Sequence, residues 1–302
     1  MKILFCSDGS IQAENAIRFG SVITAARQAD ATILGIAEDT EDESTLLQAL
    51  ARGQQLLKDK AQSVEMITKG GDPIQQILNR TLETAYDLVI IGAIRKGTKG
   101  AFSMSGKAYK IIKTITPPVL VVIGSRTRLA NVLICSGGKD YIDKAVELAG
   151  KIARGASAKC TLVHVMAEPP GMYADLINRE ENVDLLLNSS SLLGQNLKRL
   201  KQALEGMGVA TEVRLRHGDV MPELQRELSR IDYDLVVAGS VPARGRFHTY
   251  IMGDITRELI NQAECPVLVV RTGEQSGVPE SLTRFLSEVK QAFSKPPAGS
   301  PE

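Results

Sequence analysis

One segment of the sequence gathers positive charge where a helix is expected to begin. Residues 92–116 carry six cations and no carboxylate, directly after the apolar run DLVIIG that starts at Asp87. Phosphate groups are favoured beside a helix N-terminus and beside cationic side chains, because both stabilise an anion. The segment therefore predicts either a polyphosphate site or a solvated basic surface without a ligand. The cations are Arg95, Lys96, Lys99, Lys107, Lys110 and Lys113.

The chain repeats itself, so a second candidate site must be considered. The run DLVIIGA from Asp87 matches DLVVAGS from Asp234, and ILFCSDGS from Ile3 matches VLICSGGK from Val132. A closing PVLVV occurs in both copies. Ordered matches of this kind indicate a duplication. The offset grows from 129 to 147 residues, which indicates an 18-residue insertion between the first and third strands of the second copy.

Each copy alternates short apolar strands with helices. The first copy has expected strands KILFCS, ATILGIA, VEMITK, DLVIIG and PVLVV, with helices expected near 10–28, 45–60 and 71–83. Continuously apolar, β-branched strands between helices are typical of a parallel sheet covered on both faces. The second copy repeats this order, with a Leu-rich helix expected near 183–205.

We expect three parts along the chain. Repeat 1 spans 1–126 and repeat 2 spans 127–272, and the linker GSRTR is so short that the two must lie close together. The remainder, 273–302, has apolar residues at helical spacing followed by a disordered end. That helix would either dock on the chain itself or serve self-association.

Composition and charge exclude several classes of protein. The 302 residues have a net charge of +1, so the global basic field of a dedicated nucleic-acid binder is absent. No apolar run approaches the ~18 residues of a membrane span, and MKILFCSDGS is not a secretory signal, so a cytoplasmic location is expected. The four Cys and three His share no metal-ligand spacing. No catalytic constellation is apparent, and His164 is expected to be a packed histidine on a strand.

The set ILFCSDGS, GDPIQQIL, DLVIIGA and PVLVV, in this order and seen twice, resembles the universal stress protein family over about residues 1–272. The resemblance implies a Rossmann-like α/β fold, with an open, parallel, five-stranded sheet of order 3-2-1-4-5 in each repeat. It also implies that the last strands of the two repeats pair, which would make an intramolecular pseudo-dimer. Ligands in such sheets bind beyond the strand ends where the order reverses.

In repeat 1 the resemblance assigns a degenerate ATP motif, which in the family reads Gly, two residues, Gly, nine residues, Gly, then Ser or Thr. Gly92 is the first glycine, Arg95 replaces the second, Ser105 replaces the third and Gly106 replaces the Ser or Thr. Lys107 follows. Side-chain charge would here replace the close approach of backbone N–H groups to phosphate.

The rest of the implied nucleoside pocket is an acid after the first strand and an aliphatic residue on the second. Repeat 1 keeps both, as Asp8 and Ile36, whereas repeat 2 has Gly137 in place of the acid. Asp254, directly after a kept glycine, would repel phosphate, so repeat 1 is the favoured site. The candidate residues are Asp8, Ile36, Gly92, Arg95, Ser105, Gly106 and Lys107 in repeat 1, and Val165, Gly239, Gly253 and Asp254 in repeat 2.

The function expected from the sequence is stress response through binding rather than catalysis. The ligand would be ATP or a related nucleotide, with Mg²⁺ accompanying ATP, and protein partners are expected. Two alternatives stay open. One is a ligand-free interaction scaffold, which could also form larger homo-oligomers. The other is a slow ATPase or phosphotransfer enzyme built on Asp8 and the basic segment.

Overall fold

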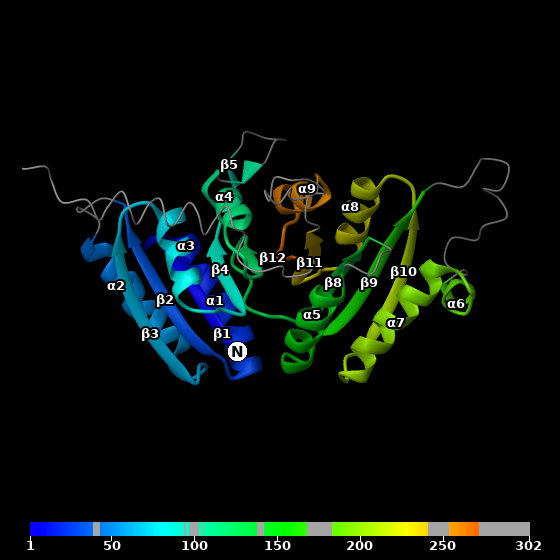
Figure 1. Cartoon of the computed structure of the whole chain (residues 1–302), viewed down its shortest axis with the longest axis horizontal. Helices are drawn as coiled ribbons and strands as arrows, with labels where there is room; N and C mark the ends of the chain where they lie inside the picture. Colours follow the sequence, from blue (N-terminus) through cyan, green and yellow to red (C-terminus); the bar gives the residue numbers. More distant parts are fainter. Residues whose placement is uncertain are drawn as a thin grey trace, which may run out of the picture.

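The computed structural model describes residues 1–38, 43–93, 95–96, 103–104, 106–137, 142–167, 183–240 and 254–271. Within these residues, both repeats contribute to one ten-stranded sheet with the order β10-β9-β8-β11-β12-β7-β4-β1-β2-β3 (Figure 1). The strands of repeat 1 are β1 (Lys2–Ser7), β2 (Asp30–Ala37), β3 (Ser63–Gly70), β4 (Leu88–Gly92) and β7 (Val119–Val122). Those of repeat 2 are β8 (Asn131–Ser136), β9 (Lys159–Met166), β10 (Thr211–His217), β11 (Leu235–Ser240) and β12 (Val267–Arg271).

Each half of the sheet has the predicted order 3-2-1-4-5, and all strand pairs within a half are parallel. The two halves meet where β7 and β12 pair antiparallel, with Leu120 opposite Leu268. These two leucines occupy equivalent positions in the repeats, so a local two-fold axis passes between them. The predicted pseudo-dimer is confirmed, and the strand pairing at its centre, here called the seam, fuses two sheets into one.

Helices cover both faces of the sheet. Two apolar clusters, one on each face, run continuously across the seam, because the central strands of both repeats contribute side chains to both. One face carries α1 (Ile11–Arg27), α2 (Glu43–Leu57), α5 (Asp143–Gly155), α6 (Val183–Leu187) and α7 (Leu192–Gly206). The other carries α3 (Pro73–Glu83), α4 (Gly106–Thr114), α8 (Val220–Arg230) and α9 (Asp254–Gln262).

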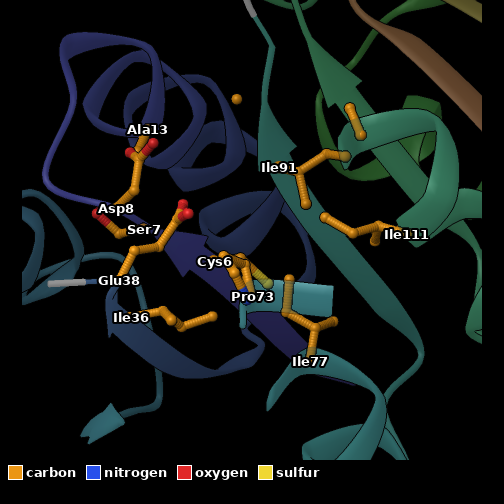
Figure 2. Close-up of a pocket in the computed structure, with 12 residues that line it drawn as sticks. Cys6, Ser7, Asp8, Ala13, Ile36, Glu38, Pro73, Ile77, Ile91 and Ile111 are labelled. Atoms are coloured by element: carbon orange, nitrogen blue, oxygen red, sulfur yellow. The ribbon is translucent and has the colours of Figure 1, made fainter. Parts of the chain in front are cut away.

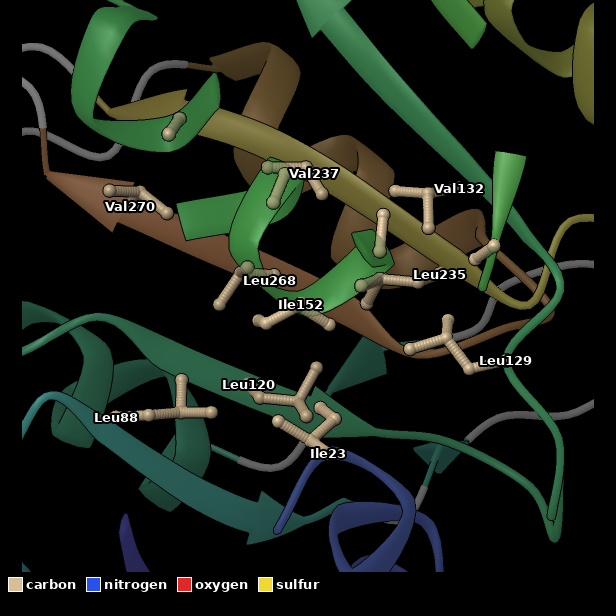
Figure 3. Packing of buried hydrophobic residues seen from close by; sticks show 14 of the residues in the cluster. Ile23, Leu88, Leu120, Leu129, Val132, Ile152, Leu235, Val237, Leu268 and Val270 are labelled. Atoms are coloured by element: carbon tan, nitrogen blue, oxygen red, sulfur yellow. The ribbon is translucent and has the colours of Figure 1, made fainter. Parts of the chain in front are cut away.

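Two helices cross closely below the seam. Ile23 of α1 and Ile152 of α5 lie in the same cluster as Leu120 and Leu268 (Figure 3). Gly155 ends α5 so close to α1 that an added Cβ would lie 2.1 Å from the carbonyl oxygen of Ala26. The repeats are therefore joined by helix packing as well as by strand pairing.

The linker is fixed to repeat 2 by a buried carboxylate. Asp234 is fully buried, and its Oδ1 accepts hydrogen bonds from Arg126 Nη1 at 3.1 Å and Arg128 Nε at 3.2 Å. Its Oδ2 accepts two backbone N–H groups at the start of β8. The equivalent Asp87 accepts the N–H of Lys2 at 2.7 Å. The acid of each DLV motif thus joins the starts of two neighbouring strands.

A polar cluster fastens α8 to the edge strand β10. Glu227 is fully buried, and its carboxylate accepts hydrogen bonds from Arg214 Nη1 at 2.8 Å, Arg216 Nε at 3.0 Å and the Tyr233 hydroxyl at 2.7 Å. Burial alone would raise the pKa of Glu227, but the hydrogen bonds from Arg216 and Tyr233, together with the charges of both arginines, hold that pKa below its ordinary value. The cluster buries an ionised carboxylate.

Repeat 1 has the same cluster with the helix charge reversed. Arg80 of α3 lies 147 residues before Glu227, and Tyr86 lies 147 residues before Tyr233. Arg80 Nε donates to the Tyr86 hydroxyl at 2.7 Å, and Arg80 Nη2 donates to Glu65 of the edge strand β3 at 2.9 Å. The Glu65 side chain is 56% exposed. The repeat 1 version is therefore the more solvated of the two.

The expected helix near 183–205 is wrong as a single element. The structure divides it into α6 and α7, because Asn188–Ser191 forms a turn and Ser191 caps α7 by accepting the N–H of Gly194 at 3.1 Å. A run of three serines favours such a break, since serine hydroxyls compete for backbone hydrogen bonds.

The segment 273–302 and most of the predicted insertion lie outside the described residues. No helix in the described part of the chain has the length and apolarity to cross a bilayer.

Candidate functional site

A hollow lies at the carboxyl ends of β1 and β4, the two strands between which the strand order of repeat 1 reverses. Its enclosed volume is about 110 Å³. In open α/β sheets, ligands bind at such reversal points. This hollow, here called the crevice, is the candidate site.

The crevice has an aliphatic wall and an acidic end. The wall is built from four elements, since β2, α3, β4 and α4 each contribute one isoleucine that points into the same space (Figure 2). Ser7 and Asp8, at the end of β1, and Glu38, just beyond β2, supply polar groups. The four isoleucines are Ile36, Ile77, Ile91 and Ile111.

The turn after β1 presents a carboxylate oxygen to the crevice. Gly9 has φ of 81°, a conformation that glycine adopts without strain, and Ser10 then caps α1 by accepting the N–H of Ala13. Asp8 Oδ1 accepts hydrogen bonds from the Ser10 N–H at 3.0 Å and the Ser10 hydroxyl at 2.5 Å. Within the described residues, Asp8 Oδ2 forms no hydrogen bond or ion pair. That oxygen remains an acceptor for a ligand.

Gly92 has a packing role that sequence reasoning missed. A Cβ at this position would lie 2.3 Å from the Gln12 carbonyl oxygen and 2.7 Å from the Ala13 nitrogen. Both atoms belong to the backbone of the first turn of α1, which cannot give way as a flexible side chain can. Glycine is therefore required for α1 to cross the end of β4, whether or not a phosphate approaches there.

The remaining motif positions of repeat 1 are described in part. Gly106 begins α4 and is exposed, and a Cβ added to it would meet no described atom within 4 Å. Arg95 lies in β5 (Arg95–Lys96), which pairs with β6 (Ser103–Met104), so a short hairpin precedes α4. The side chains of Arg95 and Lys107, and all of Ser105, lie outside the described residues.

The two α4 lysines whose side chains are described, Lys110 and Lys113, do not line the crevice. Ala108 and Ile111 are the α4 residues that line the crevice. Lys110 is exposed, and Lys113 places its Nζ 4.7 Å from the centre of the Tyr109 ring. Lys113 thus makes a cation–π contact within α4, and Lys110 faces solvent.

Two of the four candidate residues of repeat 2, Val165 and Gly239, are described in full, and they lie on strands that are not neighbours in the sheet. Gly239 lies near the end of β11, and its carbonyl oxygen accepts a hydrogen bond from the hydroxyl group of Thr256 on α9 at 3.3 Å. Val165 is half-buried on β9, while Gly253 and the side chain of Asp254 lie outside the described residues.

His164 is half-buried on β9, as predicted, with Nδ1 2.9 Å from the Ser136 carbonyl oxygen. Burial lowers the pKa of His164, although that contact opposes the shift.

Burial disfavours the thiolate form of Cys6 and Cys160. Cys6 lines the crevice, and burial raises its pKa well above the ordinary value. Burial likewise raises the pKa of Cys160 to about 12. A neutral thiol is a weak nucleophile and metal ligand. Across the described ranges, no three His, Cys, Asp or Glu side chains gather as a metal site would require.

The sequence model of the Universal stress protein family matches this chain twice, at residues 1–122 and 129–271. The chain belongs to the universal stress protein family. A universal stress protein of Methanocaldococcus jannaschii is 26% identical over 141 residues, which are 46% of this chain and 81% of that protein. The chain is thus similar to a single-repeat relative over about half its length. Family membership gives it a role in the stress response.

Two solved structures share the whole tandem architecture. The crystal structure of a universal stress protein from Archaeoglobus fulgidus covers 90% of this chain and 98% of its own, with a TM-score of 0.64 and 15% identity. The crystal structure of a Pseudomonas aeruginosa protein of unknown function matches 96% of this chain and 97% of that protein's chain, with a TM-score of 0.64 and 16% identity. At these identities the likeness concerns the fold alone.

Proposed function

We propose that this universal stress protein acts by binding a nucleotide in the crevice of repeat 1. The observation that carries the proposal is the pairing of an aliphatic wall with an available carboxylate oxygen, at the point where the strand order reverses. A nucleoside has a flat base with apolar faces and a ribose with hydroxyl donors. The isoleucine wall suits the base, and Asp8 Oδ2 suits a ribose hydroxyl.

The phosphates would extend toward the start of α4. The exposed N-terminus at Gly106 offers backbone N–H groups and the positive end of the helix dipole. The basic segment that contains Arg95 and Lys107 precedes and enters this helix, and its charges would stabilise the phosphates. ATP is the nucleotide that the family motif implies, and Mg²⁺ would enter together with ATP.

Binding is favoured over catalysis by the chemistry of the crevice. Of the crevice-lining groups that could act as nucleophiles, the thiol of Cys6 is kept neutral by burial, and the hydroxyl oxygen of Ser7 accepts the N–H of Gly9 at 3.2 Å. All three histidines belong to the second repeat. The protein would act in the cytoplasm, and protein partners would read whether the crevice is occupied.

Replacing Asp8 by asparagine is expected to weaken Mg-ATP binding at least about 10-fold, because the amide keeps an acceptor for Ser10 but loses the charge that holds a ribose hydroxyl. Isothermal titration calorimetry measures this directly. Asp59→Asn is the matched control, since Asp59 is an exposed carboxylate between α2 and β3. Equal affinity of the wild type and Asp8→Asn would contradict the assignment, and steady release of ADP would favour the slow ATPase.

A further inference from the structure

Helix α4 belongs to the crevice and to the contact between repeats at once. Ala108 and Ile111, three residues apart, face the crevice. Tyr109 and Lys113 lie on another side of the same helix, and α9 of repeat 2 faces that side across the seam (Figure 1). Any shift of α4 therefore changes the crevice wall and the contact with repeat 2 together.

Two arginines of repeat 2 hold α4 directly. Arg271, the last residue of β12, donates from Nη2 to the Ile112 carbonyl oxygen at 2.6 Å. Ile112 lies in the last turn of α4, where carbonyl groups lack partners within the helix and a cation is favoured. Arg257 of α9 places its Cζ 5.3 Å from the centre of the Tyr109 ring. One contact fixes the end of the helix and the other fixes its side.

Repeat 2 also contacts the hairpin that leads into α4. Helix α9 packs against β6, the strand that precedes α4. The apolar cluster on this face runs without a break from Ala108 and Ile111 through β7 and β12 to Leu259 and Ile260 of α9. The stretch on which phosphate binding is proposed is therefore positioned by repeat 2 at its start and its end.

We propose that Arg257 and Arg271 are positioning residues, through which repeat 2 sets the shape of the repeat 1 crevice. The inference takes its ligand from the proposed function, but the claim that repeat 2 positions α4 does not depend on a ligand. A ligand that tightens α4 must also stabilise α9, because coupling between two binding or folding events is reciprocal. Repeat 2 would then sense occupancy of repeat 1, whether or not it binds a nucleotide itself.

The test compares hydrogen exchange in full-length proteins without ligand. The variants are Arg257→Gln/Arg271→Gln and Arg271→Lys, with Arg226→Gln as the control. Arg226 is an exposed arginine of α8 whose ion pair is with Glu223 of the same helix. In the double variant, exchange of the amides of α4 is expected to rise at least about 5-fold, the low end of typical coupling effects. Arg271→Lys keeps a cationic donor and leaves Arg257 in place, so exchange of its α4 amides is expected to stay close to that of the wild type.

Binding provides the second readout. Mg-ATP is expected to slow exchange in α9 of the wild type and to bind the double variant about 10-fold more weakly. Unchanged α4 exchange in the double variant would overturn the inference, and so would unchanged affinity despite faster exchange. If the wild type binds no nucleotide, the proposed function fails, while the exchange of α4 without ligand still decides whether repeat 2 holds the crevice wall.

Discussion

Replacing Glu227 by glutamine is expected to lower the free energy of unfolding by about 3 kcal/mol or more. The substitution keeps the size of the side chain and an acceptor for Tyr233. It removes the charge opposite Arg214 and Arg216. Arg216 then lies half-buried without the Glu227 charge, whereas Arg214 keeps its ion pair with Glu212. Breaking a buried ion pair by removing one partner costs about 3–5 kcal/mol. Urea unfolding followed by far-ultraviolet circular dichroism measures the change.

The repeat offers its own control for this effect. Glu65→Gln breaks the corresponding helix-to-strand contact in repeat 1, but the Glu65 side chain is 56% exposed. Solvated ion pairs contribute about 0–1 kcal/mol, so this variant is expected to unfold almost as the wild type does. Similar losses in both variants would show that burial does not distinguish the two clusters.

Acid should reveal the same carboxylate. Because the pKa of Glu227 is lower in the folded state than its ordinary value, the group stabilises the fold above its unfolded pKa. This contribution is lost as the pH falls from about 4.5 through the folded pKa. The wild type is therefore expected to lose more stability than Glu227→Gln over this range. Parallel pH profiles would mean that Glu227 is not the group that titrates.

Replacing Gly92 by alanine is expected to cost about 3 kcal/mol of stability. The new methyl group would meet the backbone of Gln12 and Ala13, and overpacking against atoms that cannot move costs about 1–3 kcal/mol or more. Chemical denaturation measures the loss. Displacement of the first turn of α1 would also move Asp8, so nucleotide affinity is expected to fall in parallel.

Gly106→Ala is the matched control within the same motif. The space around Gly106 is open, and alanine is the better helix former, so stability is expected to stay within about 1 kcal/mol of the wild type. If Gly92→Ala instead lost binding at full stability, Gly92 would serve phosphate approach rather than packing. The pair of variants thus distinguishes two explanations of a motif glycine.

Much of the fold could be predicted because the same ordered set of strand and helix motifs occurs twice in the sequence. Apolar β-branched strands such as DLVIIG and PVLVV specify central parallel strands, and their ordered repetition carried the family resemblance that gave the strand order and the seam. The crevice followed from that order, and Asp8, Ile36 and Gly92 all line it. Sequence analysis did not predict that Glu38, Ala108, Ile111 and the α3 residues Pro73 and Ile77 also line the crevice. Residues outside a motif have no characteristic spacing by which they could be recognised.

The structural roles of charged residues were harder to foresee. Arg80 and Glu227 occupy equivalent positions in the two repeats but carry opposite charges, so a search for identical residues does not find them. The identical residues Tyr86 and Tyr233 could have indicated the cluster in both repeats. The cations of 92–116 form one group in the sequence, but the α4 residues that face the crevice are Ala108 and Ile111. Lys113 contacts Tyr109 rather than the crevice, and Tyr109 in turn meets Arg257 of the other repeat.

The most direct test of nucleotide binding in repeat 1 is to denature the full-length protein, purified without added nucleotide, and to identify and count any nucleotide released by mass spectrometry. We expect close to one adenine nucleotide per chain, and a marked loss in Asp8→Asn. Two per chain would show that repeat 2 binds as well. An empty protein that also gives no calorimetric heat with millimolar Mg-ATP would contradict nucleotide binding and leave the ligand-free scaffold.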